Sequence, residues 1–126
     1  MTRSLSQNRN KQNCIESCLK AYEVCTRTLS MGLEIHEDQS FIKTLQLCTQ
    51  VCQLAAQALL LDSNFDSRLC FLCADICTEV AELCEDFNET ERKNCAEVCL
   101  RCARACRLMS SHPASHLAMH SDIRLV

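Results

Sequence analysis

The 126-residue chain is poor in glycine, proline and aromatic residues: it has one glycine, one proline, no tryptophan and 4% aromatics. Turns between short strands depend on glycine and proline, so this composition argues against an all-β fold. No apolar run approaches the roughly 18 residues of a membrane-spanning helix. The 13 basic residues do not exceed the 16 acidic ones, so the chain lacks the positive charge that nucleic-acid binding requires.

The N-terminal segment also lacks features. Residues 1–12 are polar and contain no apolar core of a signal peptide. We therefore expect a cytoplasmic protein, in a compartment where thiols stay reduced. The length fits a single domain. The sequence shows no arrangement of nucleophile, base and orienting residue and no glycine-rich phosphate loop, so we do not expect an enzyme.

Cysteine, by contrast, is abundant, with 13 residues. Residues three or four apart lie on one face of an α-helix, and the stretch from Cys95 to Cys106 has cysteines spaced 4, 3 and 4. Cys25, Cys70 and Cys84 stand outside the pairs. The other ten form five pairs spaced four residues apart: Cys14 and Cys18, Cys48 and Cys52, Cys73 and Cys77, Cys95 and Cys99, and Cys102 and Cys106.

Helical periodicity extends over four segments. The first is expected to start at Asn13, with Glu16 completing a capping box, and to end before Gly32. The second runs from residue 38 or 39 to 61, the third follows a cap at Asp66, and the fourth ends near Met109. Short links place neighbouring helices antiparallel, so the sequence predicts an all-α, up-down-up-down four-helix bundle with a cysteine-lined core.

This interpretation divides the chain into three parts. Residues 1–12 are a polar lead-in or the frayed first turns of the first helix, residues 13–109 form the bundle, and residues 110–126 form a histidine-containing tail. Charged residues on the outer helix faces are interpreted as solvated surface.

A row of inward thiols favours Cu(I), a soft ion that accepts two or three thiolates. Thiolates that bridge neighbouring Cu(I) ions approach one metal per sulfur, which keeps a buried cluster near neutral, whereas each isolated Zn(Cys)4 unit carries two negative charges. A zinc or mixed-metal thiolate buffer or sensor is the alternative, and an oxidoreductase using dithiol or iron–sulfur chemistry is a third hypothesis. Ordinary packing and disulfides explain so many helical thiols less well.

Other soft or borderline ligands lie outside the cysteine rows. Met31 and His36 fall at the link after the first helix, where they could pass Cu(I) inward. His112, His116 and His120 lie in the tail, which we interpret as solvated. The opposite end of the bundle is expected to be plugged by a set of large apolar residues: Leu59, Leu60, Leu61, Phe65, Leu69 and Phe71.

The repeated C-x-x-x-C units, the stretch from Leu69 to Cys77 and the run from Cys95 to Cys106 resemble the copper storage protein family. The resemblance covers about residues 13–109. It implies a bundle that fills its interior with many Cu(I) ions, assembles as a homotetramer, and exchanges copper with a chaperone or recipient enzyme. The predicted metal ligands are then all 13 cysteines, with Met31 and His36. The chain departs from the most cysteine-rich members at Ala21, Phe41 and Val80.

Overall fold

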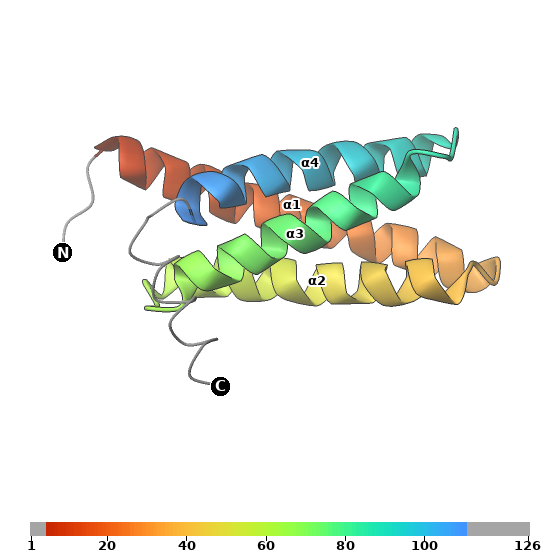
Figure 1. Cartoon of the computed structure of the whole chain (residues 1–126), viewed down its shortest axis with the longest axis horizontal. Helices are drawn as coiled ribbons and strands as arrows, with labels where there is room; N and C mark the ends of the chain where they lie inside the picture. The colour runs from red at the N-terminus through yellow and green to blue at the C-terminus, as the bar shows by residue number, and fades with distance from the viewer. Residues whose placement is uncertain (1–4, 111–126) are drawn as a thin grey trace, which may run out of the picture.

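The computed structural model describes residues 5–110 and consists of four helices (Figure 1). The predicted tail and its residues His112, His116 and His120 lie outside this range. The helices are α1 (Leu5–Glu34), α2 (Gln39–Leu60), α3 (Asp66–Cys84) and α4 (Thr90–Ser110).

The four helices run alternately up and down, and each packs mainly on its two neighbours in the ring α1–α2–α3–α4 (Figure 1). The links α1–α2 and α3–α4 lie at one end of the bundle, and the α2–α3 link lies at the other. The predicted antiparallel four-helix bundle is therefore confirmed. Among the described helices, none combines the length and apolar character needed to cross a membrane.

The start of α1 differs from the prediction. The helix begins at Leu5 and continues through Asn13, so Asn13 does not cap it. Residues 5–12 are thus its first turns. Lys11 in this extension forms an ion pair with Asp62 in the α2–α3 link, at 2.6 Å. This ion pair joins the polar extension to the rest of the bundle.

The end of α1 also differs from the prediction. Gly32 lies inside the helix with a negative φ, and the left-handed residue is His36, with φ of 55°. The Glu37 N–H donates to the Gly32 carbonyl at 2.9 Å, which closes a Schellman motif. An added Cβ at position 32 would lie 2.8 Å from Ile42 Cδ1, so a larger residue there requires the end of that side chain to move.

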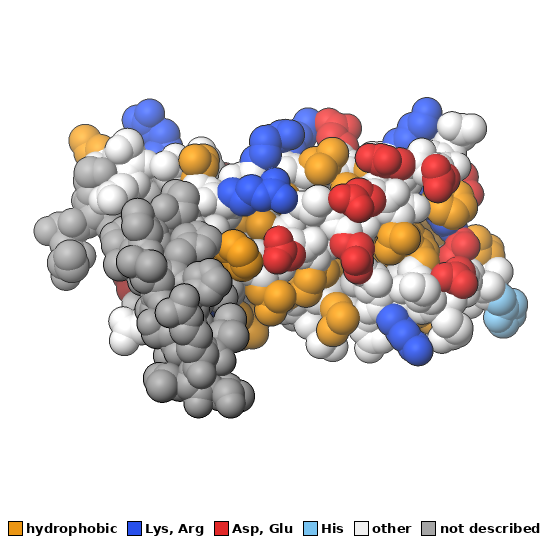
Figure 2. All heavy atoms as spheres, viewed as in Figure 1, with side chains coloured by type: hydrophobic (Ala, Val, Ile, Leu, Met, Phe, Trp, Pro, Cys, Tyr) orange, Lys and Arg blue, Asp and Glu red, His pale blue; other side chains and the backbone are white. Residues whose placement is uncertain are grey.

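The other helix ends are simpler. Asp38 caps α2 as expected, and its carboxylate accepts hydrogen bonds from the Ser40 and Phe41 N–H groups. Asp66 was expected to cap α3 but is its first helical residue, and Phe65 stands at the cap without a side-chain bond. Charged side chains cover much of the outer helix faces (Figure 2). The buried core between the four helices is built largely from the cysteines.

Candidate metal centre

Every cysteine faces the inside of the bundle, and none is more than 1% exposed. The helical periodicity explains this, because one apolar stripe on each helix is buried against the other three. Leu45 and Leu59 on α2 are buried with them. The contributions are Cys14, Cys18 and Cys25 from α1, Cys48 and Cys52 from α2, Cys70, Cys73, Cys77 and Cys84 from α3, and Cys95, Cys99, Cys102 and Cys106 from α4.

The sulfur atoms form a continuous column along the bundle axis, which we call the sulfur column. At one end, Cys14 Sγ lies 4.0 Å from Cys70 Sγ and 3.6 Å from Cys106 Sγ. Cys18 Sγ lies 3.6 Å from Cys106 Sγ and 3.7 Å from Cys102 Sγ. Helix α2 contributes no sulfur at this level and joins the column only towards the middle of the bundle.

The column continues through the middle of the bundle. Cys102 Sγ lies 3.9 Å from Cys73 Sγ, which lies 3.7 Å from Cys52 Sγ. Cys77 Sγ lies 3.7 Å from both Cys52 Sγ and Cys48 Sγ. Helices α2, α3 and α4 thus meet sulfur to sulfur at the centre.

The column reaches its other end near the α3–α4 link. Cys25 Sγ lies 3.8 Å from Cys48 Sγ, 3.8 Å from Cys95 Sγ and 3.4 Å from Cys99 Sγ. Cys84 follows as the last member, with its thiol hydrogen-bonded to Cys95. No sulfur of the 13 stands apart from this column.

The thiols fall into overlapping groups in which all sulfurs lie within 4.8 Å of one another. Cys73, Cys77, Cys99, Cys102 and Cys106 each belong to two groups, and Cys84 belongs to none. The groups are Cys18, Cys73, Cys102 and Cys106; Cys52, Cys73, Cys77 and Cys102; Cys14, Cys70 and Cys106; Cys25, Cys95 and Cys99; and Cys48, Cys77 and Cys99.

This overlap decides which metal chemistry fits the site. With metal–sulfur bonds of about 2.3 Å, sulfurs around a three-coordinate ion lie about 4.0 Å apart and those around a tetrahedral ion about 3.8 Å apart, so distance alone favours neither. Each isolated tetrahedral site needs four ligands that it does not share with another site. Cys73 and Cys102, however, belong to both four-cysteine groups. Shared thiols suit an ion of low coordination number that accepts bridging thiolates, which is the chemistry of Cu(I).

Comparison with known proteins agrees with this chemistry. Residues 7–111 match the family model described as copper storage protein. The chain belongs to the copper storage protein family. It is 33% identical over 101 residues to a Bacillus subtilis protein named "uncharacterized cysteine-rich protein YhjQ", covering 78% of this chain and 94% of that one.

Two solved structures of the family have the same fold. The Cu(I)-bound copper storage protein BsCsp3 is 32% identical, with a TM-score of 0.76 over 80% of this chain and 98% of its own. The metal-free Csp3 from Bacillus subtilis is also 32% identical, with a TM-score of 0.73 over 79% and 97% of the two chains. The predicted family is confirmed. Ala21, Phe41 and Val80, the positions at which the resemblance implies further cysteines in other members, are buried.

The thiols of the metal-free column are electrostatically linked. Hydrogen bonds to Cys48, Cys95 and Cys99, together with burial, raise the pKa of Cys25. Accepting hydrogen bonds from Cys25, Cys52 and Cys77 lowers the pKa of Cys48. A first proton can thus leave an acceptor thiol, but each further thiolate adds uncompensated charge to a dry core. A bound cation removes this penalty, so metal uptake and proton release must be coupled.

The raised pKa values predict an alkaline loss of stability in the metal-free, reduced protein. The hydrogen bond to Cys95, together with burial, raises the pKa of Cys84. Hydrogen bonds to other cysteines, of which that to Cys102 has the largest effect, raise the pKa of Cys77. Their stabilising contribution is complete below the ordinary thiol pKa of 9.0, where both states are protonated. It is lost progressively as the pH rises above that value, because the unfolded thiols ionise while the folded ones keep their protons. Thiols of lowered pKa, such as Cys48, are ionised in both states above pH 9.0 and change nothing further.

We therefore expect the melting temperature of the metal-free protein to fall as the pH rises above 9. Metal-loaded protein is the control, because its thiolates have already lost their protons. It should show a much smaller fall over the same range. Equal falls in the loaded and metal-free samples would contradict the linkage to the thiols.

Met31 and His36 lie outside the sulfur column. Met31 is 39% exposed at the end of α1, and His36 is exposed in the α1–α2 link. Phe41, at the start of α2, and Phe87, in the α3–α4 link, belong to the same end of the bundle, and their ring centroids lie 6.3 Å apart. Met31 and His36 are therefore at the expected end of the bundle, but the structure does not bring them into the cysteine groups.

The same end contains a residue that the sequence analysis did not single out. Arg92 is 4% exposed, and its guanidinium carbon lies 3.9 Å from the Phe87 ring centroid and 5.0 Å from that of Phe41. A signal for it was present: continuing the α4 stripe backwards from Cys95 by three residues leads to Arg92. The spacing 3, 4, 3, 4 then runs without interruption to Cys106.

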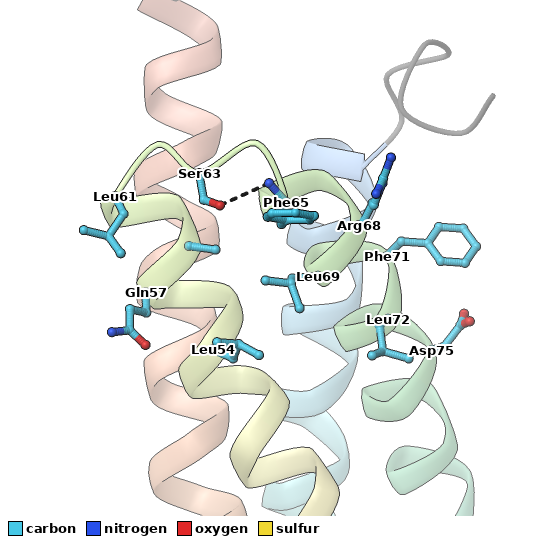
Figure 3. A pocket seen from close by; sticks show the side chains of 11 residues that line it. Leu54, Gln57, Leu61, Ser63, Phe65, Arg68, Leu69, Phe71, Leu72 and Asp75 are labelled. Carbon is cyan, nitrogen blue, oxygen red and sulfur yellow. Dashed lines mark hydrogen bonds between the residues drawn. The ribbon is translucent and has the colours of Figure 1, made fainter. Parts of the chain in front are cut away.

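The opposite end of the bundle is less closed than predicted. Leu59 is buried and Leu69 packs against the core, but Leu60, Leu61 and Phe65 are 62%, 71% and 59% exposed. Those three residues therefore do not plug the bundle. Leu61, Phe65 and Leu69, with Phe71 and Leu72, instead border an open apolar groove between α2 and α3, outside the sulfur column (Figure 3).

Proposed function

We propose that the chain stores and sequesters Cu(I), holding many ions per molecule on the thiolates of the sulfur column. The observation that carries this proposal is the overlap of the five cysteine groups, since five thiols each belong to two of them. A site of this kind is filled by bridged ions rather than by separate ones. The fold shared with the Cu(I)-bound BsCsp3 supports the choice of metal.

The ligands in this proposal are all 13 cysteines. Cys84 belongs to none of the groups, but its thiol contacts Cys95 and extends the column by one ligand. Loading the reduced protein with Cu(I) and counting the ions retained after gel filtration tests the proposal. Retention on the order of one ion per thiol supports it, whereas retention of three or four ions supports the zinc alternative.

The proposed role involves no catalysis. Thiols that are at most 1% exposed are shielded from molecular substrates, while a single ion can pass between them by ligand exchange. We place the protein in the cytoplasm, where reducing conditions keep the thiols in the free state that copper binding requires. A copper chaperone or a recipient enzyme completes the exchange, and a homotetramer, implied by the family resemblance, is the assembly we propose.

We also propose that Met31 and His36 are the first ligands that incoming Cu(I) meets. Both are exposed. Met31 lies in the last turn of α1, and His36 lies in the α1–α2 link next to Glu37, the ion-pair partner of Arg92. A thioether and an imidazole bind Cu(I) more weakly than two thiolates do, so the ion can move on into the column. The weaker ligands would thus set the rate of loading and leave the capacity unchanged.

Replacing Met31 by Leu and His36 by Asn tests this step. Asn suits position 36 because it tolerates the left-handed φ of 55° there. We expect the double variant to take up Cu(I) from a chelator several-fold more slowly, with an unchanged final number of ions. A matched control replaces Leu33 by Ala in the same turn. Unchanged uptake in the double variant would show that copper enters the bundle elsewhere.

A further inference from the structure

Arg92 is the one buried charged residue in the part of the chain that the structure describes. It lies in the first turns of α4, and its guanidinium group stacks on Phe87 and Phe41. Burying a charge costs free energy unless ion pairs and hydrogen bonds compensate it. The partners of this guanidinium group therefore show whether its charge is fully compensated.

Only part of the guanidinium group of Arg92 has a partner. Nη2 donates to the Glu37 carboxylate, and Nε lies 3.8 Å from a carboxylate oxygen of Glu89. Nη1 is buried and makes no hydrogen bond within residues 5–110. A buried donor without an acceptor is costly, so one that persists in a native structure requires an explanation, such as an ion or ligand group that it contacts when bound.

The position of Arg92 indicates which ligand this is. Cys95 lies three residues further along α4, on the same inward stripe. Burial lowers the pKa of Arg92, and the charge of Cys95 partly offsets this lowering. Cys95 and Cys84 form the end of the sulfur column. Arg92 is therefore a buried cation one helical turn from Cys95, on the same face of α4.

Charge must accumulate at this end when copper binds. In the middle of the column each thiolate can be shared by two Cu(I) ions, and the charges cancel. At the end, Cys84 and Cys95 have neighbours on one side only, so two thiolates on a terminal Cu(I) leave one negative charge. Such a charge in a dry environment requires a counter-charge.

On the basis of the proposed function, we propose that Arg92 is the counter-charge of the terminal copper–thiolate group. Cu(I) displaces the thiol protons of Cys84 and Cys95 to solvent, and Nη1 of Arg92 then donates a hydrogen bond to the thiolate sulfur. No electron is transferred. Arg92 is thus a positioning residue that stabilises the last ion without ligating it.

A purely structural role for Arg92 makes a different prediction. In that case its contribution is the ion pair with Glu37 that closes the end of the bundle, so removing either partner should have the same effect on copper. If Arg92 is a counter-charge, Glu37 competes with the thiolates for the guanidinium. Removing Glu37 should then strengthen the binding of the terminal ion, and removing Arg92 should weaken it.

The test compares Arg92→Met, Arg92→Lys and Glu37→Gln with the unchanged protein. The matched control is Arg101→Met, because Arg101 lies on the exposed face of the same helix and pairs with Glu97 at 2.5 Å. Each protein is loaded anaerobically with Cu(I), and the transfer of ions to a chelator is followed over time. Melting of the metal-free proteins measures the structural effect separately.

We expect Arg92→Met to release a small fraction of its copper, about one ion, at least tenfold faster, in line with losses of outer metal-site partners. Arg92→Lys should recover most of the retention, Glu37→Gln should release that ion more slowly than the unchanged protein, and Arg101→Met should be neutral. Equal acceleration by Arg92→Met and Glu37→Gln, or no effect of Arg92→Met, would overturn the inference. Failure of the unchanged protein to hold more than four ions would instead overturn the proposed function.

Discussion

Replacing Cys73 and Cys102 together by alanine is expected to remove about four of the bound Cu(I) ions, because each of these thiols belongs to both four-cysteine groups. The two sulfurs lie 3.9 Å apart and connect the two halves of the column. Each bridging thiolate serves two ions, and a Cu(I) left with a single thiolate should be lost to a competing chelator. The loss per cysteine should therefore exceed one ion.

The matched control replaces Cys70 and Cys84 by alanine. These two cysteines lie at opposite ends of the column, and each has fewer sulfur neighbours than Cys73 or Cys102. This variant should lose about two ions or fewer, since terminal thiolates bridge less. Both variants remove two buried sulfurs, so cavity effects on the fold are similar, and far-UV circular dichroism should show that both remain helical. Equal losses from both variants would show that the thiols do not act as bridges.

The arrangement of cysteines along each helix could be predicted from the sequence, because spacings of three and four place side chains on one face regardless of the neighbouring helices. All 13 predicted cysteines are buried in the core for this reason. Which sulfurs meet across helices could not be predicted. That register depends on how the links close, as in the Schellman turn at His36, where the sequence had suggested that the helix ends at Gly32.

The charged residue at the end of the column was missed for a related reason. Arginine is usually solvent-exposed, so the sequence analysis did not single out Arg92 although its position continues the inward stripe of α4. Its burial depends on Phe41 and Phe87, which come from two different parts of the chain and meet only in the folded bundle. The same limit applies to Leu60, Leu61 and Phe65, whose apolar character suggested a plug although the structure leaves them exposed.

The extension of α1 towards the N-terminus was also outside the reach of local signals. The spacing of Asn13 and Glu16 favoured a helix start there, but a capping box predicts a start only if the preceding residues are not helical. The ion pair between Lys11 and Asp62 joins this extension to the α2–α3 link, which is 51 residues away in the sequence. Contacts of this range override a local capping preference.

The most direct measurement of the central claim is an anaerobic titration of the fully reduced protein with Cu(I) against a competing chelator, with a parallel titration using Zn(II). Thirteen thiols in overlapping groups predict saturation on the order of one Cu(I) per thiol and weak, low-capacity zinc binding. Saturation at three or four ions, or zinc bound as tightly as copper in that ratio, would mean that the thiols form separate tetrahedral sites, and would contradict copper storage by bridging thiolates.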